Sequence, residues 1–177
     1  LEVFADDHNE MIRQAKILSN LGPSVYVKIP ITNSFGKSSV AVIKELLQEK
    51  IKLNITAILT ENQINECLEV LDKNNIVYLS IFAGRIADTG RDPKPIFKKY
   101  KKLIQNMGFN FLELLWASTR EVFNVYEAIE SDCDIITLTP EIIKKLDLKY
   151  YDLKKLSLET VQMFKNDSSK SNFSIDN

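Results

Sequence analysis

Short apolar runs alternate with longer amphipathic runs along almost the whole chain, and turn residues separate them. We expect strands at residues 1–5, 25–29, 53–59, 76–82, 111–117 and 135–138. Helical periodicity fills most of the intervals, with further helical stretches after Pro140 and at residues 157–165. Regular alternation of strand and helix predicts parallel strands joined by right-handed crossovers. The predicted class is therefore α/β, either an open doubly wound sheet or a closed (β/α)8 barrel.

The length of the chain limits how many domains and strands it can form. Its 177 residues suffice for one domain with a substantial core. We predict a single domain over residues 1–165 and a loose, polar, Ser/Asn-rich tail over residues 166–177. Six strands can form an open sheet unaided, whereas a closed barrel needs eight strands and usually about 250 residues. Periodicity alone therefore slightly favours the open sheet.

Charge, hydropathy and cysteine content exclude several classes of partner. Lys plus Arg (23) nearly cancels Asp plus Glu (24), so we expect no basic face and no nucleic-acid partner. No apolar run reaches the length of a membrane span. Cys67 and Cys133 lie far apart without a histidine at metal-ligand spacing, so we expect free thiols, no metal site and a reducing, cytoplasmic location.

Polar residues occupy strand positions where a purely structural strand would have Val or Ile. They are Glu2, Lys28, Asn54, Thr56 and Ser80. Successive side chains of a strand point to opposite faces. If the rows that carry these residues all face one interior, the five polar side chains converge there.

Lys28 carries the most specific chemistry of this set. It lies in the strand Val25-Tyr26-Val27-Lys28-Ile29-Pro30, with apolar neighbours on both sides. Burying an ammonium is costly, so the neutral amine becomes populated, and a neutral amine is the nucleophile of a Schiff-base enzyme. In the alternative reading, Lys28 extends to solvent or pairs with Glu2 and is only structural. Taken alone, the residue favours that structural alternative.

Two other segments have chemistry that suits a phosphate. Ser118-Thr119-Arg120 lies at a strand-to-helix junction, and Arg85 and Arg91 flank residues 83–93, which we predict to be the longest loop. The alternatives are a helix cap and solvated arginines. Gly36-Lys37-Ser38 is similar to the end of a phosphate-binding P-loop, but Ile31 stands in place of the first glycine, so we reject that motif.

Four stretches together resemble the transaldolase family, including its small fructose-6-phosphate-aldolase-like branch. They are Val27-Lys28-Ile29-Pro30 followed by Thr32, Leu53-Asn54-Ile55-Thr56-Ala57, Ser80-Ile81-Phe82-Ala83-Gly84-Arg85-Ile86, and Ala117-Ser118-Thr119-Arg120. They occur in the family's order and at its spacing. The resemblance implies a (β/α)8 TIM barrel of the transaldolase type, which replaces the open sheet as our prediction.

The same resemblance implies that the barrel is incomplete in this chain, with about six βα units and without its first two strands. Family members carry a catalytic Asp on the first barrel strand and a Thr-Asn-Pro stretch on the second. Neither has a counterpart before Leu1. We therefore expect a fragment or an N-terminally truncated chain.

Roles for individual residues also follow from the resemblance. Its catalytic residues would be Lys28, which forms the Schiff base, and Glu2 and Thr56, which transfer protons through a water. The substrate-binding residues would be Asn54, Ser80, Phe82, Arg85, Ser118 and Arg120, the last three as a phosphate clamp. Phe82 resembles the transferase type, whereas the aldolase branch tends to carry Tyr at this position.

The implied activity is that of a transaldolase of the pentose phosphate pathway. It would transfer a dihydroxyacetone unit between ketose and aldose phosphates, with fructose 6-phosphate or sedoheptulose 7-phosphate as donor. No metal or organic cofactor is implied, because the iminium is itself the electron sink. Its partners would be sugar phosphates. The oligomeric state is left open, with a homo-oligomer as one possibility because small family members tend to form rings. The alternatives are a fructose-6-phosphate aldolase-like enzyme, an inactive sugar-phosphate-binding paralogue and, more weakly, an open-sheet nucleotide-binding domain without a Gly-rich loop.

Overall fold

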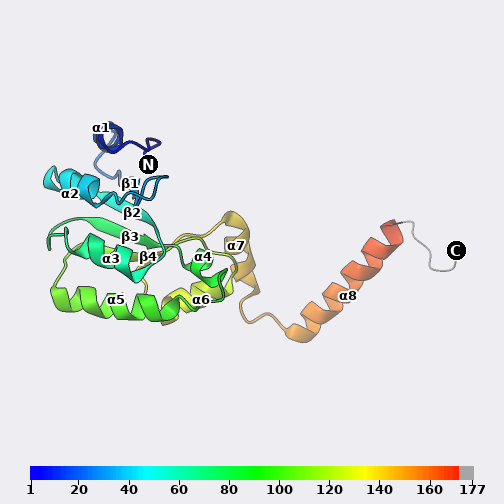
Figure 1. The fold of residues 1–177 in the computed structure, drawn as a ribbon. Helices are drawn as coiled ribbons and strands as arrows, with labels where there is room; N and C mark the ends of the chain where they lie inside the picture. The colour runs from blue at the N-terminus through cyan, green and yellow to red at the C-terminus, as the bar shows by residue number, and fades with distance from the viewer. Residues whose placement is uncertain (172–177) are drawn as a thin grey trace. The chain divides into compact units, whose positions relative to one another are not determined.

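The computed structural model describes residues 1–171, which fall into two compact units, Leu1–Thr139 and the part from Pro140 on. The first unit contains α1 (His8–Ser19), β1 (Val27–Pro30), α2 (Val40–Gln48), β2 (Leu53–Ile58), α3 (Glu61–Leu68), β3 (Val77–Ile81), α4 (Ala83–Ala87), α5 (Lys94–Met107), β4 (Leu112–Trp116), α6 (Phe123–Glu130) and β5 (Ile135–Ile136) (Figure 1). The second contains α7 (Pro140–Lys145), a 3₁₀ helix (Leu146–Leu148) and α8 (Leu153–Lys170).

The strands form one parallel sheet in the order β1-β2-β3-β4-β5, which is also their order along the chain. The register places Lys28 beside Asn54 and Ser80 beside Leu115. Each strand follows its neighbour through a helical connection, as in the wall of a (β/α) barrel. The predicted α/β class with parallel strands is confirmed, and the sheet corresponds to part of such a barrel.

The predicted first strand, residues 1–5, is reduced to a single parallel bridge between Glu2 and Lys28. The backbone N–H of Lys28 donates to Leu1 O at 2.7 Å, and that of Val3 donates to Lys28 O at 3.2 Å. Pairing then stops, because the N–H groups of the next two residues donate to the side chain of Gln14 instead. The sheet therefore has five strands rather than the six predicted.

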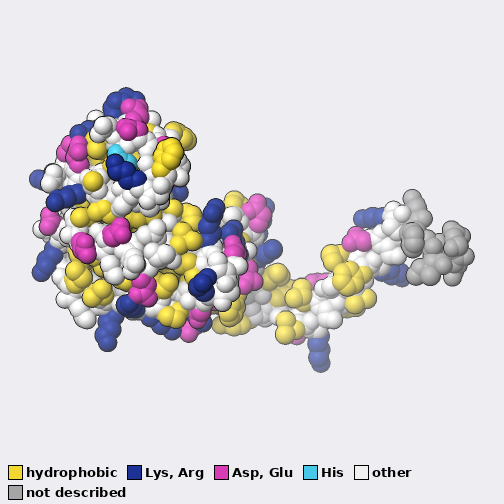
Figure 2. Space-filling view, viewed as in Figure 1, with side chains coloured by type: hydrophobic (Ala, Val, Ile, Leu, Met, Phe, Trp, Pro, Cys, Tyr) yellow, Lys and Arg dark blue, Asp and Glu magenta, His cyan; other side chains and the backbone are white. Residues whose placement is uncertain are grey.

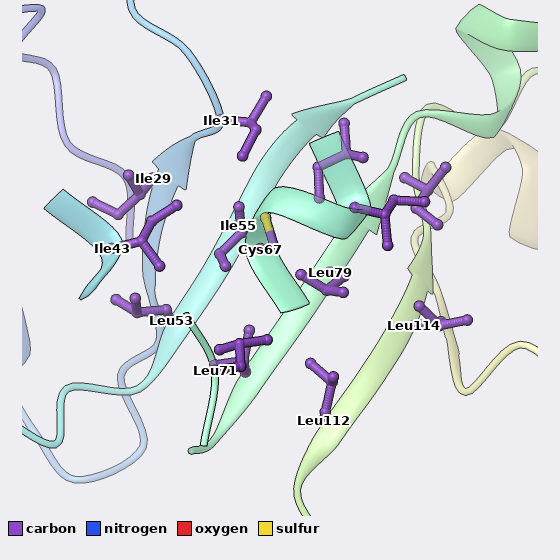
Figure 3. Packing of buried hydrophobic residues seen from close by; sticks show 14 of the residues in the cluster. Ile29, Ile31, Ile43, Leu53, Ile55, Cys67, Leu71, Leu79, Leu112 and Leu114 are labelled. Atoms are coloured by element: carbon purple, nitrogen blue, oxygen red, sulfur yellow. The ribbon is translucent and has the colours of Figure 1, made fainter. Parts of the chain in front are cut away.

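The hydrophobic core lies between the helices and one face of the sheet (Figure 3). Alternate strand residues point into it and are fully buried, among them Val27, Ile29, Leu53, Ile55, Val77, Leu79 and Leu114. Ile43 from α2 and Cys67 from α3 pack against them. Phe97 of α5 stacks on Trp116 of β4, with ring centroids 4.7 Å apart. The strand residues between these apolar positions are thereby left to the opposite, inner face.

The inner face carries aromatic residues toward the amino ends of the strands. Tyr26 and Tyr78 stack there with ring centroids 4.1 Å apart and an interplanar angle of 11°. Burial, a hydrogen bond with Tyr78 and the charge of Glu113 raise the pKa of Tyr26 to about 12. Lys28, Asn54, Thr56 and Ser80 lie on the same face and line a cavity that continues past the carboxyl ends of the strands, the end where barrel enzymes hold their active sites.

Two segments predicted to be irregular contain helix. Residues 83–93, predicted to be the longest loop, begin with the short helix α4, because Ala83 and Ile86 are buried in the core. Residues 166–170 of the predicted loose tail belong to α8. The rest of that tail lies largely outside the described residues, and the predicted single-domain boundary at 165 stays a prediction.

The second unit consists mainly of α8, which begins after Asp152. The Asp152 carboxylate accepts a hydrogen bond from the backbone N–H of Lys155 and caps the helix. Leu158, Val161 and Phe164 are exposed at a spacing of three residues. On the visible face, Lys and Arg are interspersed with Asp and Glu (Figure 2). Up to residue 171, no helix is both long enough and apolar enough to cross a membrane.

We expect Ile55→Ala to destabilise the fold strongly. Ile55 is fully buried in the middle of β2, so the truncation leaves a cavity that costs about 2–5 kcal/mol. Urea unfolding measures the loss. Ile17→Ala on the exposed side of α1 is the matched control and should change stability by no more than about 0.5 kcal/mol. Equal effects of the two substitutions would contradict the core described above.

Candidate functional site

A cavity of 340 Å³ opens at the carboxyl ends of the strands, within the first unit. Its lining residues are Lys28, Asn54, Thr56, Ser80, Phe82, Arg85, Leu115, Ala117, Ser118, Arg120 and Thr137. A larger hollow of 760 Å³ lies at the amino ends of β2 and β3, next to Lys50 and Asn75. The smaller cavity is the candidate site, because it gathers a primary amine, hydroxyls, an amide and two guanidinium groups at the end of the sheet where barrel enzymes react.

Every residue to which the resemblance assigns a role lines this cavity except Glu2. Glu2 instead forms an ion pair with the lining residue Lys28. Three lining residues were not predicted: Leu115, Ala117 and Thr137. Ala117 and Thr137 follow the last residues of β4 and β5 closely. The position of Thr137, a polar residue at the carboxyl end of a predicted strand, is the signal that could have identified it.

Lys28 forms an ion pair instead of lying in a dry, apolar environment. Its Nζ lies 3.3 Å from Oε2 of Glu2, and its side chain is 34% exposed, against 49% for Glu2. The expectation of full burial is therefore wrong, because the apolar neighbours in the sequence point to the other face of the sheet. The structure shows the pairing of Lys28 with Glu2. The pair places a proton acceptor directly beside the amine.

Asn54 and Ser80 are joined across neighbouring strands. The Ser80 hydroxyl, which is buried, donates to Oδ1 of Asn54 at 2.6 Å. This bond uses the amide oxygen of Asn54 as an acceptor, so its NH₂ group points away from Ser80 and acts as a donor. The parallel register puts Asn54 directly beside Lys28. A hydroxyl group on a ligand bound at Lys28 would thus meet an oriented amide donor.

Thr56 presents a buried hydroxyl to the cavity. Its side chain is only 2% exposed, and no described residue bonds its Oγ1. The neighbouring Ala57 has φ +60°, and the pairing register of β2 with β3 shifts between Ile55 and Ile58. Thr56 lies two residues after Asn54, so ordinary strand alternation places it on the same face, where it lines the cavity, and the bulge after it returns Ile58 to the core. A buried hydroxyl of this kind is suited to a water or a ligand.

The arginines lie at the rim formed by α4 and the segment after β4. Arg120 forms an ion pair with Asp88, with Nη2 2.6 Å from Oδ2, and the Arg85 guanidinium lies 5.8 Å from the ring centroid of Phe82. Arg91, the further phosphate candidate, donates to Thr89 and is not among the lining residues. The two lining arginines make this rim cationic.

Gly84 allows α4 to approach the segment after β4. A Cβ atom added at Gly84 would lie 1.7 Å from the carbonyl oxygen of Ser118, closer than any real contact. The backbone N–H of Gly84 donates to Ala117 O at 3.4 Å. Ser118 itself has φ +65°, which is uncommon for a residue other than glycine. The close approach therefore brings Arg85 and Arg120, from two separate segments, to one cavity.

A comparison with known families identifies the chain. The family model described as Transaldolase/Fructose-6-phosphate aldolase matches residues 1–176. The chain belongs to that family. The resemblance drawn from the four short stretches is thus confirmed, and the five-stranded parallel sheet is consistent with part of the family's barrel.

Individual relatives in the transaldolase family agree with this assignment. The chain is 31% identical over 159 residues to a probable transaldolase of Nitrosopumilus maritimus (strain SCM1). This match covers 90% of the chain and 67% of the relative. It is 33% identical over 145 residues to probable transaldolase 2 of Listeria monocytogenes serovar 1/2a, a match that covers 82% of the chain and 62% of the relative. A probable transaldolase of Coprothermobacter proteolyticus is 32% identical over 146 residues, and this match covers 82% of the chain and 63% of the relative. The chain spans roughly two thirds of the length of these relatives.

We expect Gly84→Ala to destabilise the first unit by about 1–3 kcal/mol, because the added methyl group forces α4 away from the carbonyl of Ser118. Thermal or urea unfolding measures this change. Gly22→Ala is the control, since a Cβ atom there meets nothing within 4 Å and the residue has no positive φ. A Gly84→Ala protein as stable as the control would show that the close approach is absent in solution.

Proposed function

We propose that this chain carries the Schiff-base site of a transaldolase, which transfers a dihydroxyacetone unit between ketose and aldose phosphates. The observation that carries the proposal is one cavity lined by the Lys28 amine, the Asn54 amide, the hydroxyls of Thr56 and Ser80, and two arginines. Membership of the transaldolase/fructose-6-phosphate aldolase family supports it. The chemical requirement is a nucleophilic amine at one end of the cavity and an anion-binding group at the other.

Glu2 is placed to take the proton that Lys28 must lose. An ammonium cannot attack a carbonyl, so the amine has to be neutral when the substrate arrives. The Glu2 carboxylate, 3.3 Å from Nζ, accepts that proton. The amine then attacks C2 of the ketose phosphate, the carbinolamine loses water, and an iminium forms. Thr56, whose hydroxyl has no partner among the described residues, holds the water that carries protons between Glu2 and the C2 oxygen.

The iminium withdraws electrons from the C3–C4 bond, which breaks after the C4 hydroxyl loses its proton. An aldose phosphate leaves, and an enamine of dihydroxyacetone stays on Lys28 until a second aldose adds to it. Among the residues that the structure describes, no carboxylate lines the cavity. In a complete barrel, the proton acceptor for the C4 hydroxyl is the Asp that the family carries on its first strand. Asn54, oriented by Ser80, donates to a hydroxyl of the bound unit.

The cationic rim formed by Arg85 and Arg120, with the Ser118 hydroxyl, binds the phosphate of the substrate. Guanidinium groups bind phosphate oxygens through paired, charge-assisted hydrogen bonds. Fixing the phosphate at the rim holds the scissile bond near Lys28, which lowers the entropic part of the barrier. Arg120 must share its guanidinium between the phosphate and Asp88. Its several N–H donors allow both contacts.

We expect borohydride reduction in the presence of fructose 6-phosphate to add mass irreversibly at Lys28, because the hydride traps the iminium. Peptide mass spectrometry locates the adduct. Lys28→Met should abolish it, whereas Lys37→Met, on the exposed loop after β1, should leave it unchanged. An adduct at any other lysine, or no adduct at all, would contradict the assignment of Lys28.

An inactive sugar-phosphate-binding protein is the second candidate. The specific observation in its favour is the ion pair of Lys28 with Glu2, which is also what a purely structural lysine would form. Phosphate binding that survives Lys28→Met, together with no borohydride adduct in the unmodified protein, would favour this candidate. The two functions are therefore separated by the same experiment.

We expect Thr56→Val to slow imine formation by about 10²–10⁴-fold, the range of general acid–base effects, because the water loses its anchor. Folding stability should not fall, since the buried hydroxyl has no described partner to lose. Single-turnover adduct formation and urea unfolding measure the two effects. Thr56→Ser retains the hydroxyl and should stay close to the unmodified rate. A Thr56→Val protein that reacts normally would remove Thr56 from the catalytic set.

A homo-oligomer remains part of the proposal. The exposed apolar side chains of α8, Leu158, Val161 and Phe164, form a stripe of the kind that a helix buries against a partner. A second copy of the chain is the partner that the predicted ring would provide. The small-molecule partners proposed for the cavity remain sugar phosphates.

A further inference from the structure

We infer that Asn124, the second residue of α6, is a positioning residue that holds Arg120 in place for the phosphate of the substrate. The inference rests on the proposed function, because it concerns the same cavity. Asn124 does not line the cavity and would not contact the ligand. It acts through the backbone of the segment that connects β4 to α6.

The Asn124 side chain is buried, with 6% of its surface exposed, and all of its hydrogen bonds are directed at this segment and its own helix. Its Oδ1 accepts from the backbone N–H of Arg120 at 2.9 Å and from that of Glu121 at 3.2 Å. Its Nδ2 donates to Oε2 of Glu127, one turn further along α6, at 2.7 Å. One side chain thus fixes two consecutive peptide groups.

Glu127 determines which way the amide faces. With two N–H donors on one side and a carboxylate on the other, only one orientation of the Asn124 amide satisfies all three partners. The reversed orientation would set donor against donor and oxygen against carboxylate. The oxygen is therefore held toward the backbone of Arg120.

The segment needs such an anchor because its other restraints are weak or strained. Ser118 is held at φ +65°, a conformation that costs free energy unless the surroundings impose it. The Arg120–Asp88 ion pair is about half exposed at both partners, and exposed pairs contribute little to order. Thr119 donates through Oγ1 to the carbonyl of Thr137 at 2.5 Å, which ties the segment to the end of β5 but leaves Arg120 itself free to move. Asn124 supplies the buried restraint next to Arg120.

A consequence for the anion site is that Asn124 already occupies the backbone N–H groups of Arg120 and Glu121. A phosphate at the rim therefore binds through the arginine side chains and the Ser118 hydroxyl rather than through these two amides. Affinity for phosphate then depends on the orientation of the Arg120 guanidinium. Asn124 determines that orientation by fixing the backbone of Arg120.

The test uses inorganic phosphate as the probe and titration calorimetry as the measurement. Asn124→Leu keeps the approximate size of the side chain and removes the acceptor. We expect it to weaken phosphate binding by about tenfold, the effect of losing one to two hydrogen bonds. The borohydride adduct of Lys28 with unphosphorylated dihydroxyacetone should stay at the unmodified rate, because that substrate does not use Arg120. A purely structural role would change both measurements together.

A conservative pair of variants tests the same contact without removing it. Asn124→Asp keeps an acceptor for both amides but sets a second carboxylate against Glu127, so phosphate binding should weaken. Adding Glu127→Gln restores a donor to that carboxylate and should recover the affinity. Should Asn124→Leu fail to fold, this pair decides: if Asn124→Asp binds phosphate as tightly as the unmodified chain, the inference is overturned.

Failure of the proposed function and failure of the role of Asn124 give different results. If the unmodified protein gives neither a phosphate isotherm nor a Lys28 adduct, the proposed function is wrong. If the unmodified protein gives both and Asn124→Leu binds phosphate with unchanged affinity, only the role of Asn124 is wrong.

Discussion

The parallel register of β1 to β4 is the constraint on which the rest of the site depends. Side chains alternate between the two faces of a strand, so Lys28, Asn54 and Ser80 share the inner face only because Ile29, Ile55 and Leu79 are buried on the other. A slip of one residue would turn the polar row into the apolar core and is therefore strongly disfavoured. The apolar packing that stabilises the fold thus also aligns the groups proposed to react.

The two ends of the cavity are built by different means. The amine end belongs to the sheet, where strand pairing places Lys28 beside Asn54. The cationic end belongs to connecting segments, which have no ladder to hold them. Close packing at Gly84 and the side chain of Asn124 take over that task. The cavity therefore joins a rigid wall to a rim that depends on a few specific contacts.

Several local features that destabilise the fold lie around the same cavity. The Thr56 hydroxyl is buried and bonds no residue up to position 171, and a buried group of this kind costs about 1–3 kcal/mol. Ala57 and Ser118 both adopt positive φ values, which are uncommon outside glycine. Strain of this kind persists only where the surrounding structure imposes it, and it concentrates at functional sites. Its location agrees with the proposed chemistry at Lys28.

The sequence by itself determined the α/β class and the approximate limits of β1 to β4, because alternation and helical periodicity are local properties of the chain. Alternation also indicated Lys28, Asn54, Thr56 and Ser80, whereas Phe82, Arg85, Ser118 and Arg120 followed from the resemblance to the transaldolase family. It did not determine that residues 1–5 keep only the bridge at Glu2, that α4 replaces part of an apparent loop, or that Lys28 pairs with Glu2. Nor did it indicate Asn124, whose partners are backbone groups that leave no pattern in the sequence. These features depend on which distant segments meet in space, and only the tertiary structure decides that.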